Sequence, residues 1–346
     1  NSELVQSVIP LERYRALIGA LASDKDTFDD TYWLRFSAQI VVLCPESPPK
    51  LAYRIRSVAA ELIKSTDWYQ ALASPARFVV AAMLIQHRIP VADFISEHAH
   101  ATATMNEIGL RHSRLHEIIT VIIIMMTPGH RSSSVLDIER IKAIYDQMKA
   151  HHWWLTGPDD VPACAALAQR PGSPEFLGSQ VEAAYQQLHG IGIPIGEHLQ
   201  TAANLLPLSG LEISLTVRRY NNLIAIFKEH KSVLTESDYD PMAMLCLLDQ
   251  DPELVISKLL AVAGELDLFQ PDGHGESNML IASDLTFLDL VRVSEQPSNL
   301  GESYPTAHML HTLHAYHLAS AVLISQMNLD LVQLEGLNGV PQWSYP

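Results

Sequence analysis

The chain has 346 residues, of which 48% are apolar, a composition typical of a globular protein long enough to bury a large core. Its formal net charge is −16 with the histidines neutral. Because phosphate backbones and anionic bilayers attract clustered Lys and Arg, this charge argues against nucleic-acid binding and against binding to a membrane surface.

Helical spacing of the apolar residues predominates along the chain, so the sequence predicts an all-α protein. Residues 1–49 hold one or two helices, and a first four-helix unit follows at residues 50–133. Its last helix, residues 113–126, is apolar on every side, so we expect residues 115–125 to lie at the centre of the molecule. The apolar face and the helix starts of this unit are Ile55, Val58, Leu62, Ser74, Pro75 and Pro90.

The same four-helix order recurs in a second unit at residues 134–210 and a third unit at residues 211–295. Residues 296–346 add a last helix and a tail. The helices of the second unit are predicted near residues 138–148, 160–169, 174–188 and 197–208.

An internal repeat connects the second and third units. Leu155-Thr156-x-x-Asp159-x-x-Pro162 recurs 79 residues later as Leu234-Thr235-x-x-Asp238-x-x-Pro241. Repeated units stack on their neighbours, so we predict tandem four-helix repeats with a period of about 79–83 residues, arranged as a helical solenoid or as an α/α toroid. All loops are short, which favours one domain over residues 1–346 with caps at residues 1–49 and 296–346.

A resemblance to a known family rests on the repeated Leu-Thr-x-x-Asp-x-x-Pro segment. It also rests on Ser173-Pro174-Glu175-Phe176 and on the Tyr185-x-x-Leu188 and Gly196-x-x-Leu199-Gln200 spacings. The chain resembles, over roughly residues 50–289, a family of uncharacterised bacterial proteins that is common in Gram-positive bacteria and is catalogued as a domain of unknown function. The resemblance implies a soluble, all-helical bacterial protein, and it carries over no catalytic residue.

Cysteine usage and hydropathy indicate a soluble, cytoplasmic protein. Cys44, Cys164 and Cys246 are far apart in apolar surroundings, which predicts reduced thiols and no disulfide framework. The most apolar stretch, residues 118–126, is much shorter than the roughly 20 residues that cross a bilayer. The amino terminus also lacks a charged start followed by an apolar signal core.

Asp159 and Asp238 are the acidic residues of the repeated segment, and each lies three residues before a proline. An N-cap aspartate followed by a proline in the first turn gives this spacing, because the first N–H groups of a helix have no intrahelical acceptor. We therefore interpret both residues as structural rather than as acid–base catalysts.

A histidine series in the last helix is the strongest candidate for a metal site. Adjacent members are three residues apart, so two imidazoles can share zinc or nickel. All four cannot face one ion, because three-residue steps drift by about 60° on a helix. The alternative is an apolar helix face flanked by partly exposed histidines. The residues are His308, His311, His314 and His317.

Other candidate ligand-binding residues occur once rather than in every unit. Arg131 lies in a Ser-rich segment before a helix start, where either an anion binds or the serines simply cap the helix. Trp153 and Trp154, with Arg218 and Tyr220, form either a ligand or partner surface or a plug between units. No phosphate-binding loop and no dinucleotide motif is present.

Two functional hypotheses follow. The first is a helical-repeat binding protein whose ligand is a peptide, a protein or a small molecule. The alternative is an enzyme with its active site in the central cavity of an α/α toroid, where His residues hold a metal. The sequence leaves open whether the chain is an enzyme, and it identifies no cofactor.

Overall fold

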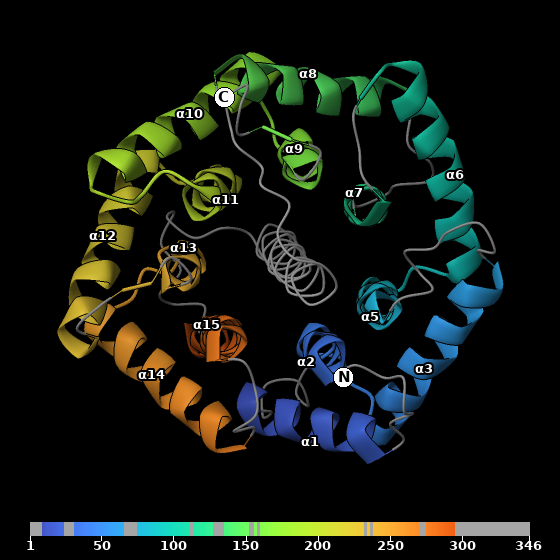
Figure 1. Ribbon diagram of the computed structural model, residues 1–346, viewed down its shortest axis with the longest axis horizontal. Coiled ribbons are helices and arrows are strands. Elements are labelled where there is room, and N and C mark those ends of the chain that lie inside the picture. Colours follow the sequence, from blue (N-terminus) through green and yellow to red (C-terminus); the bar gives the residue numbers. More distant parts are fainter. Residues whose placement is uncertain are drawn as a thin grey trace, which may run out of the picture.

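Two concentric layers of helices make up the computed structural model (Figure 1). The structure describes residues 9–23, 31–65, 75–110, 114–126, 135–151, 156–157, 160–231, 234–235, 238–269 and 275–294, and these residues form helices and loops without a strand. The outer layer consists of α1 (Pro10–Ser23), α3 (Pro48–Ser65), α6 (Val91–Glu107), α8 (Val135–His151), α10 (Pro174–Gly190), α12 (Ile213–His230) and α14 (Pro252–Phe269). The inner layer consists of α2 (Thr31–Ile40), α5 (Ala76–His87), α7 (Arg114–Met125), α9 (Val161–Ala168), α11 (Glu197–Leu205) with the 3-10 helix η3 (Leu206–Ser209), α13 (Asp240–Leu245) and α15 (Gly275–Ser294).

The described helices close into a ring (Figure 1). The last described helix, α15, packs against α14 and also contacts both α1 and α2 at the other end of the chain. The described residues are all-helical, as predicted, whereas tandem four-helix repeats, as a solenoid or an α/α toroid, stay a prediction. The division into three units with terminal caps stays a prediction.

Helix boundaries in the described part agree closely with the sequence pattern, and proline explains several of the starts. The predicted helices at residues 160–169 and 174–188 correspond to α9 and α10. Ser173 is the N-cap of α10, where its side-chain oxygen accepts a hydrogen bond from the N–H of Phe176 at 3.2 Å. Pro174 follows at the first helical position, where a missing N–H costs nothing because that group has no helical acceptor.

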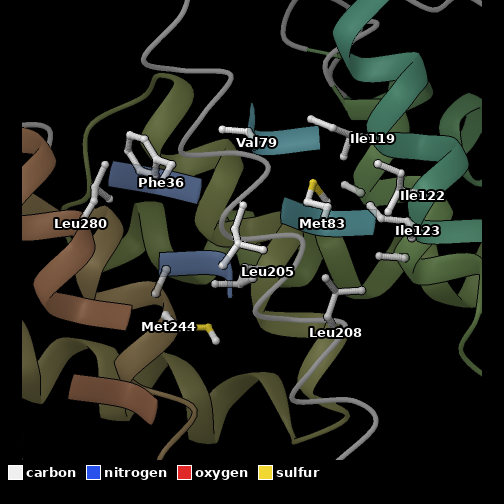
Figure 2. Close-up of a cluster of buried hydrophobic side chains, with 14 of the residues drawn as sticks. Phe36, Val79, Met83, Ile119, Ile122, Ile123, Leu205, Leu208, Met244 and Leu280 are labelled. Carbon is white, nitrogen blue, oxygen red and sulfur yellow. The ribbon is translucent and has the colours of Figure 1, made fainter. Parts of the chain in front are cut away.

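Buried apolar side chains of the inner helices gather in one cluster. α7 is an inner helix and its residues Ile118 to Ile123 are almost completely buried, as predicted for a helix without a polar face. Figure 2 shows buried side chains from different inner helices converging on the middle. They are Phe36, Val79, Met83, Ile119, Ile122, Ile123, Leu205, Leu208, Met244 and Leu280.

Asp238 has a structural role, but it is not the N-cap that we expected. The N-cap of α13 is Tyr239, and Asp238 instead accepts hydrogen bonds from the N–H and the hydroxyl of Thr235, at 2.7 and 2.8 Å. The carboxylate is thus bonded to the loop before α13 rather than to the first N–H groups of the helix. Lys231 completes the contact by donating to Asp238 at 2.6 Å. Asp159 lies outside the described residues.

No single helix among the described residues is long and apolar enough to cross a bilayer, and α5 and α6 reach that length only together, across a bend of 107°. All three cysteines are free thiols, as predicted. Cys164 and Cys246 are buried, whereas Cys44 is only partly buried.

Candidate functional site

A pocket of about 480 Å³ lies where two neighbouring inner helices end. One wall is the loop from α2 to α3, and the other is the end of α5, which contacts both helices (Figure 1). Its volume is in the range of small-molecule sites, which are about 300–1,000 Å³. The pocket is lined by Leu43, Cys44, Pro45, Glu46, Arg54, Ile85, Gln86 and Arg88.

Arg13 of the outer helix α1 holds the first wall in place. Its guanidinium donates to the carbonyl oxygens of Val42 at 3.1 Å and Cys44 at 2.5 Å, and also to that of Glu46. Hydrogen bonds from a charged donor are stronger than neutral ones. One arginine therefore fixes alternate carbonyls of the loop that carries half of the pocket.

The same arrangement occurs elsewhere in the ring. Arg140 of α8 donates to the carbonyls of Ala168 at 2.9 Å, Arg170 at 2.8 Å and Gly172 at 2.8 Å, in the loop from α9 to α10. The two loops also correspond in sequence, as Cys44-Pro45-Glu46-Ser47-Pro48 and Arg170-Pro171-Gly172-Ser173-Pro174. We call each loop from an inner helix to the next outer helix a junction. These two junctions are thus built in the same way.

They differ at the position that faces the end of the neighbouring inner helix. In the second junction Arg170 reaches across and donates to the carbonyl of Leu208 at 2.8 Å. In the first junction that position holds Cys44, whose Sγ lies 3.9 Å from Oε1 of Gln86. A cysteine is too short to bridge this gap as an arginine does, and the pocket lies at this place.

Arg88, an exposed residue, lines the pocket and has an unusual backbone conformation, with φ of 56° and ψ of 38°. It follows α5, where its N–H bonds to Ile85 and the N–H of Ile89 bonds to Leu84. The same pair of bonds ends α6 and α10, but there the left-handed residue is glycine, Gly109 and Gly192. The left-handed conformation costs a residue with a Cβ roughly 1–2 kcal/mol. Within the described part of the chain, the Arg88 guanidinium makes no hydrogen bond or ion pair.

The charges around the pocket favour an anionic ligand. Arg54 and Arg88 lie on its walls against a single carboxylate, Glu46, which forms an ion pair with Arg54 through Oε1. Burial, reinforced by Glu46, raises the pKa of Cys44 to about 11, although Arg54, Arg13 and Arg88 oppose this shift. The thiol is therefore protonated at neutral pH, when a cysteine nucleophile would need to be a thiolate. The arrangement is suited to binding an anion rather than to thiol chemistry.

Two further polar pairs lie elsewhere in the ring. Nε2 of His98 lies 2.8 Å from Oε1 of Glu117, which also accepts from Thr102 at 2.5 Å, and all of this is between α6 and α7. Nδ1 of His198 on α11 lies 2.8 Å from Oδ2 of Asp240 on α13. Among the described residues, no group of three or more His, Cys, Asp or Glu side chains is placed to hold a metal ion.

Most of the candidate residues from the sequence fall outside the described part of the chain. These are Arg131, Trp153, Trp154, His308, His311, His314 and His317. Arg218 is exposed on α12, whereas Tyr220 on the same helix is completely buried and donates its hydroxyl to the carbonyl of Tyr239 at 3.0 Å. The structure therefore places these two residues on different faces of α12.

Sequence reasoning missed the pocket residues, although two signals were present. Comparing residues 44–48 with residues 170–174 exposes the exchange of Arg170 for Cys44 at otherwise similar junctions. The other signal is Arg88 at a helix end where a glycine is usual. The two walls come together only in three dimensions, because α5 lies beside α2.

Comparison with known proteins gives a family and no activity. A family model described as "Protein of unknown function (DUF4003)" matches residues 25–294. Over 126 residues the chain is 27% identical to the uncharacterized protein YeaA of Bacillus subtilis (strain 168), and the match covers 36% of this chain and 37% of that protein. The chain therefore spans little more than a third of that relative's length in the match. No solved structure matches.

Proposed function

Because the chain belongs to the DUF4003 family of proteins of unknown function, its role must be argued from the site, and we propose that it is a binding protein for a small anion. The ligand carries a carboxylate or a phosphate group, and it binds in the pocket between Glu46, Arg54 and Arg88. Guanidinium groups are well suited to this task, because their fork of N–H donors matches both kinds of oxyanion.

The observation that carries the proposal is the conformation of Arg88. Strain that the surrounding fold maintains is a reason to look for a function of the strained residue. At the equivalent ends of α6 and α10 a glycine meets the same backbone requirement without that strain. An arginine at this point keeps a positive charge at the pocket.

We also propose that the ring is built from tandem four-helix repeats and that the pocket lies where two otherwise similar loops, each joining an inner helix to the next outer helix, differ. Arg140 and Arg219 are 79 residues apart, the spacing of the repeated Leu-Thr-x-x-Asp-x-x-Pro segment, and Arg219 likewise contacts the loop after its inner helix, at Asp249. Features shared by all junctions serve the scaffold, so a feature of one junction is the better candidate for binding.

The wild-type protein is expected to bind small anions. Isothermal titration with succinate and with inorganic phosphate should give a saturable signal at micromolar to millimolar concentration, weakening as sodium chloride is raised, because exposed charges are screened by salt. Tetramethylammonium chloride at the same ionic strength serves as the control and should give no signal. Absence of binding for every carboxylate and phosphate tested up to about 10 mM would contradict the proposal.

An enzyme with its active site at the centre of the ring is the alternative, and one contact favours it. His198 and Asp240 come from different inner helices, and a carboxylate beside Nδ1 is the arrangement that orients a histidine for proton transfer. The metal version of this alternative depends on His308, His311, His314 and His317, which lie outside the described residues.

Metal content separates the two functions. The enzyme alternative predicts close to one equivalent of zinc, nickel or iron in the untagged protein after dialysis without chelator, measured by inductively coupled plasma mass spectrometry. The metal should be lost in the double variant His311→Ala and His314→Ala, while His198→Ala, which leaves the histidine series intact, retains it. The anion-binding proposal expects no such metal.

A further inference from the structure

Among the described residues that line the pocket, Glu46 is the one with an acidic side chain. Its carboxylate is mostly buried, with 22% of the side chain exposed, and its backbone carbonyl is held by Arg13. A pocket built only for an anion would gain nothing from a carboxylate, because like charges repel. The position of Glu46 therefore favours a ligand that carries a positive group in addition to its anionic group.

The hydrogen-bonding capacity of the walls supports this. Glu46 contacts Arg54 through Oε1 only, and Oε2 has no partner among the described residues. The amide nitrogen of Gln86 has none in the same part of the chain, and neither has the guanidinium of Arg88. The pocket thus combines open donors with one open anionic acceptor.

The remaining lining is apolar. Leu43, Pro45 and Ile85 contribute hydrocarbon surface next to the charged groups, and the volume of about 480 Å³ accommodates a ligand of several heavy atoms. A molecule that fits has three parts: an anion for Arg88, a cation for Glu46, and a hydrocarbon group against the apolar wall.

We propose that the ligand is a zwitterionic amino acid with an apolar side chain. This inference rests on the proposed anion site, since the carboxylate of the amino acid is the anion that Arg88 binds. The ammonium group donates to Oε2 of Glu46. The Glu46 side chain therefore determines specificity, because it distinguishes an amino acid from a simple carboxylic acid of the same shape.

Three probes of matched shape test the inference by isothermal titration of the wild-type protein. These are L-leucine, 4-methylpentanoate, which lacks the amino group, and 3-methylbutylamine, which lacks the carboxylate. We expect leucine to bind at least about 10-fold more tightly than 4-methylpentanoate, since a charge-assisted hydrogen bond is lost, and the amine to give no signal. In Glu46→Gln the advantage of leucine over 4-methylpentanoate should disappear, because the acceptor for the ammonium group loses its charge.

Each outcome decides one question. If 4-methylpentanoate equals leucine in the wild-type protein, the zwitterion inference is wrong and the anion site stands. If neither binds, and succinate and phosphate also fail, the anion site itself is wrong. The comparison of probes on the wild-type protein decides the matter even if Glu46→Gln fails to fold, and circular dichroism of that variant identifies this case.

Discussion

Arg88→Gly is expected to raise the free energy of unfolding by about 1 kcal/mol and to weaken anion binding by about 10-fold or more. Glycine adopts the backbone conformation of Arg88 without the Cβ strain of roughly 1–2 kcal/mol, and the greater freedom of glycine in the unfolded chain offsets part of this gain. The affinity falls because the arginine that meets the anion is removed. Urea unfolding and titration with succinate measure the two effects separately.

A variant that gains stability while it loses binding is informative, because general damage to the fold changes both in the same direction. Gly192→Arg is the matched control, since it places an arginine with positive φ at a helix end with the same pair of backbone hydrogen bonds, and a Cβ there meets no atom within 4 Å. It should lose about 1 kcal/mol of stability from backbone strain alone. It should also leave anion binding unchanged. Unaltered binding in Arg88→Gly would remove the basis of the proposed function.

The helices were predictable from the sequence because their determinants are local. Apolar residues three and four apart, together with Pro90 and Pro174 at helix starts, set the boundaries without reference to the rest of the chain. The burial of α7 was predictable for the same reason. Its residues 118–124 offer no polar face that could lie toward water.

The closure of the ring and the pocket depend on contacts between segments far apart in the sequence. No local pattern predicts that α15 contacts α1 and α2. Those contacts depend on the small rotation from each pair of helices to the next, added up around the whole ring. In the same way, Cys44 and Arg88 belong to separate loops, and neither carries a recognisable motif. Tyr220, for which the sequence left open a binding surface or a plug between units, is buried.

Arg13→Ala and Arg140→Ala are expected to lose similar amounts of stability, about 3 kcal/mol each. Each arginine donates to three loop carbonyls at one junction, and truncation leaves partly buried acceptors without a donor. Only Arg13 holds the wall of the pocket. Anion binding should therefore weaken by about 10-fold in Arg13→Ala and stay at the wild-type level in Arg140→Ala, because ordering a loop on binding reduces affinity.

The paired design separates the role of the pocket wall from the cost of a weakened fold. Urea unfolding gives the stability of both variants, and titrations at a temperature where both are fully folded give the affinities. Equal loss of affinity in the two variants would show that stability alone governs binding. No loss in Arg13→Ala would mean that the loop at residues 42–46 needs no support, so that the binding determinants reduce to Arg88 and the groups on α3 and α5. A selective loss in Arg13→Ala would link the support of the loop to ligand binding, since an arginine that holds loop carbonyls, as Arg140 does at the other junction, would here also position a ligand.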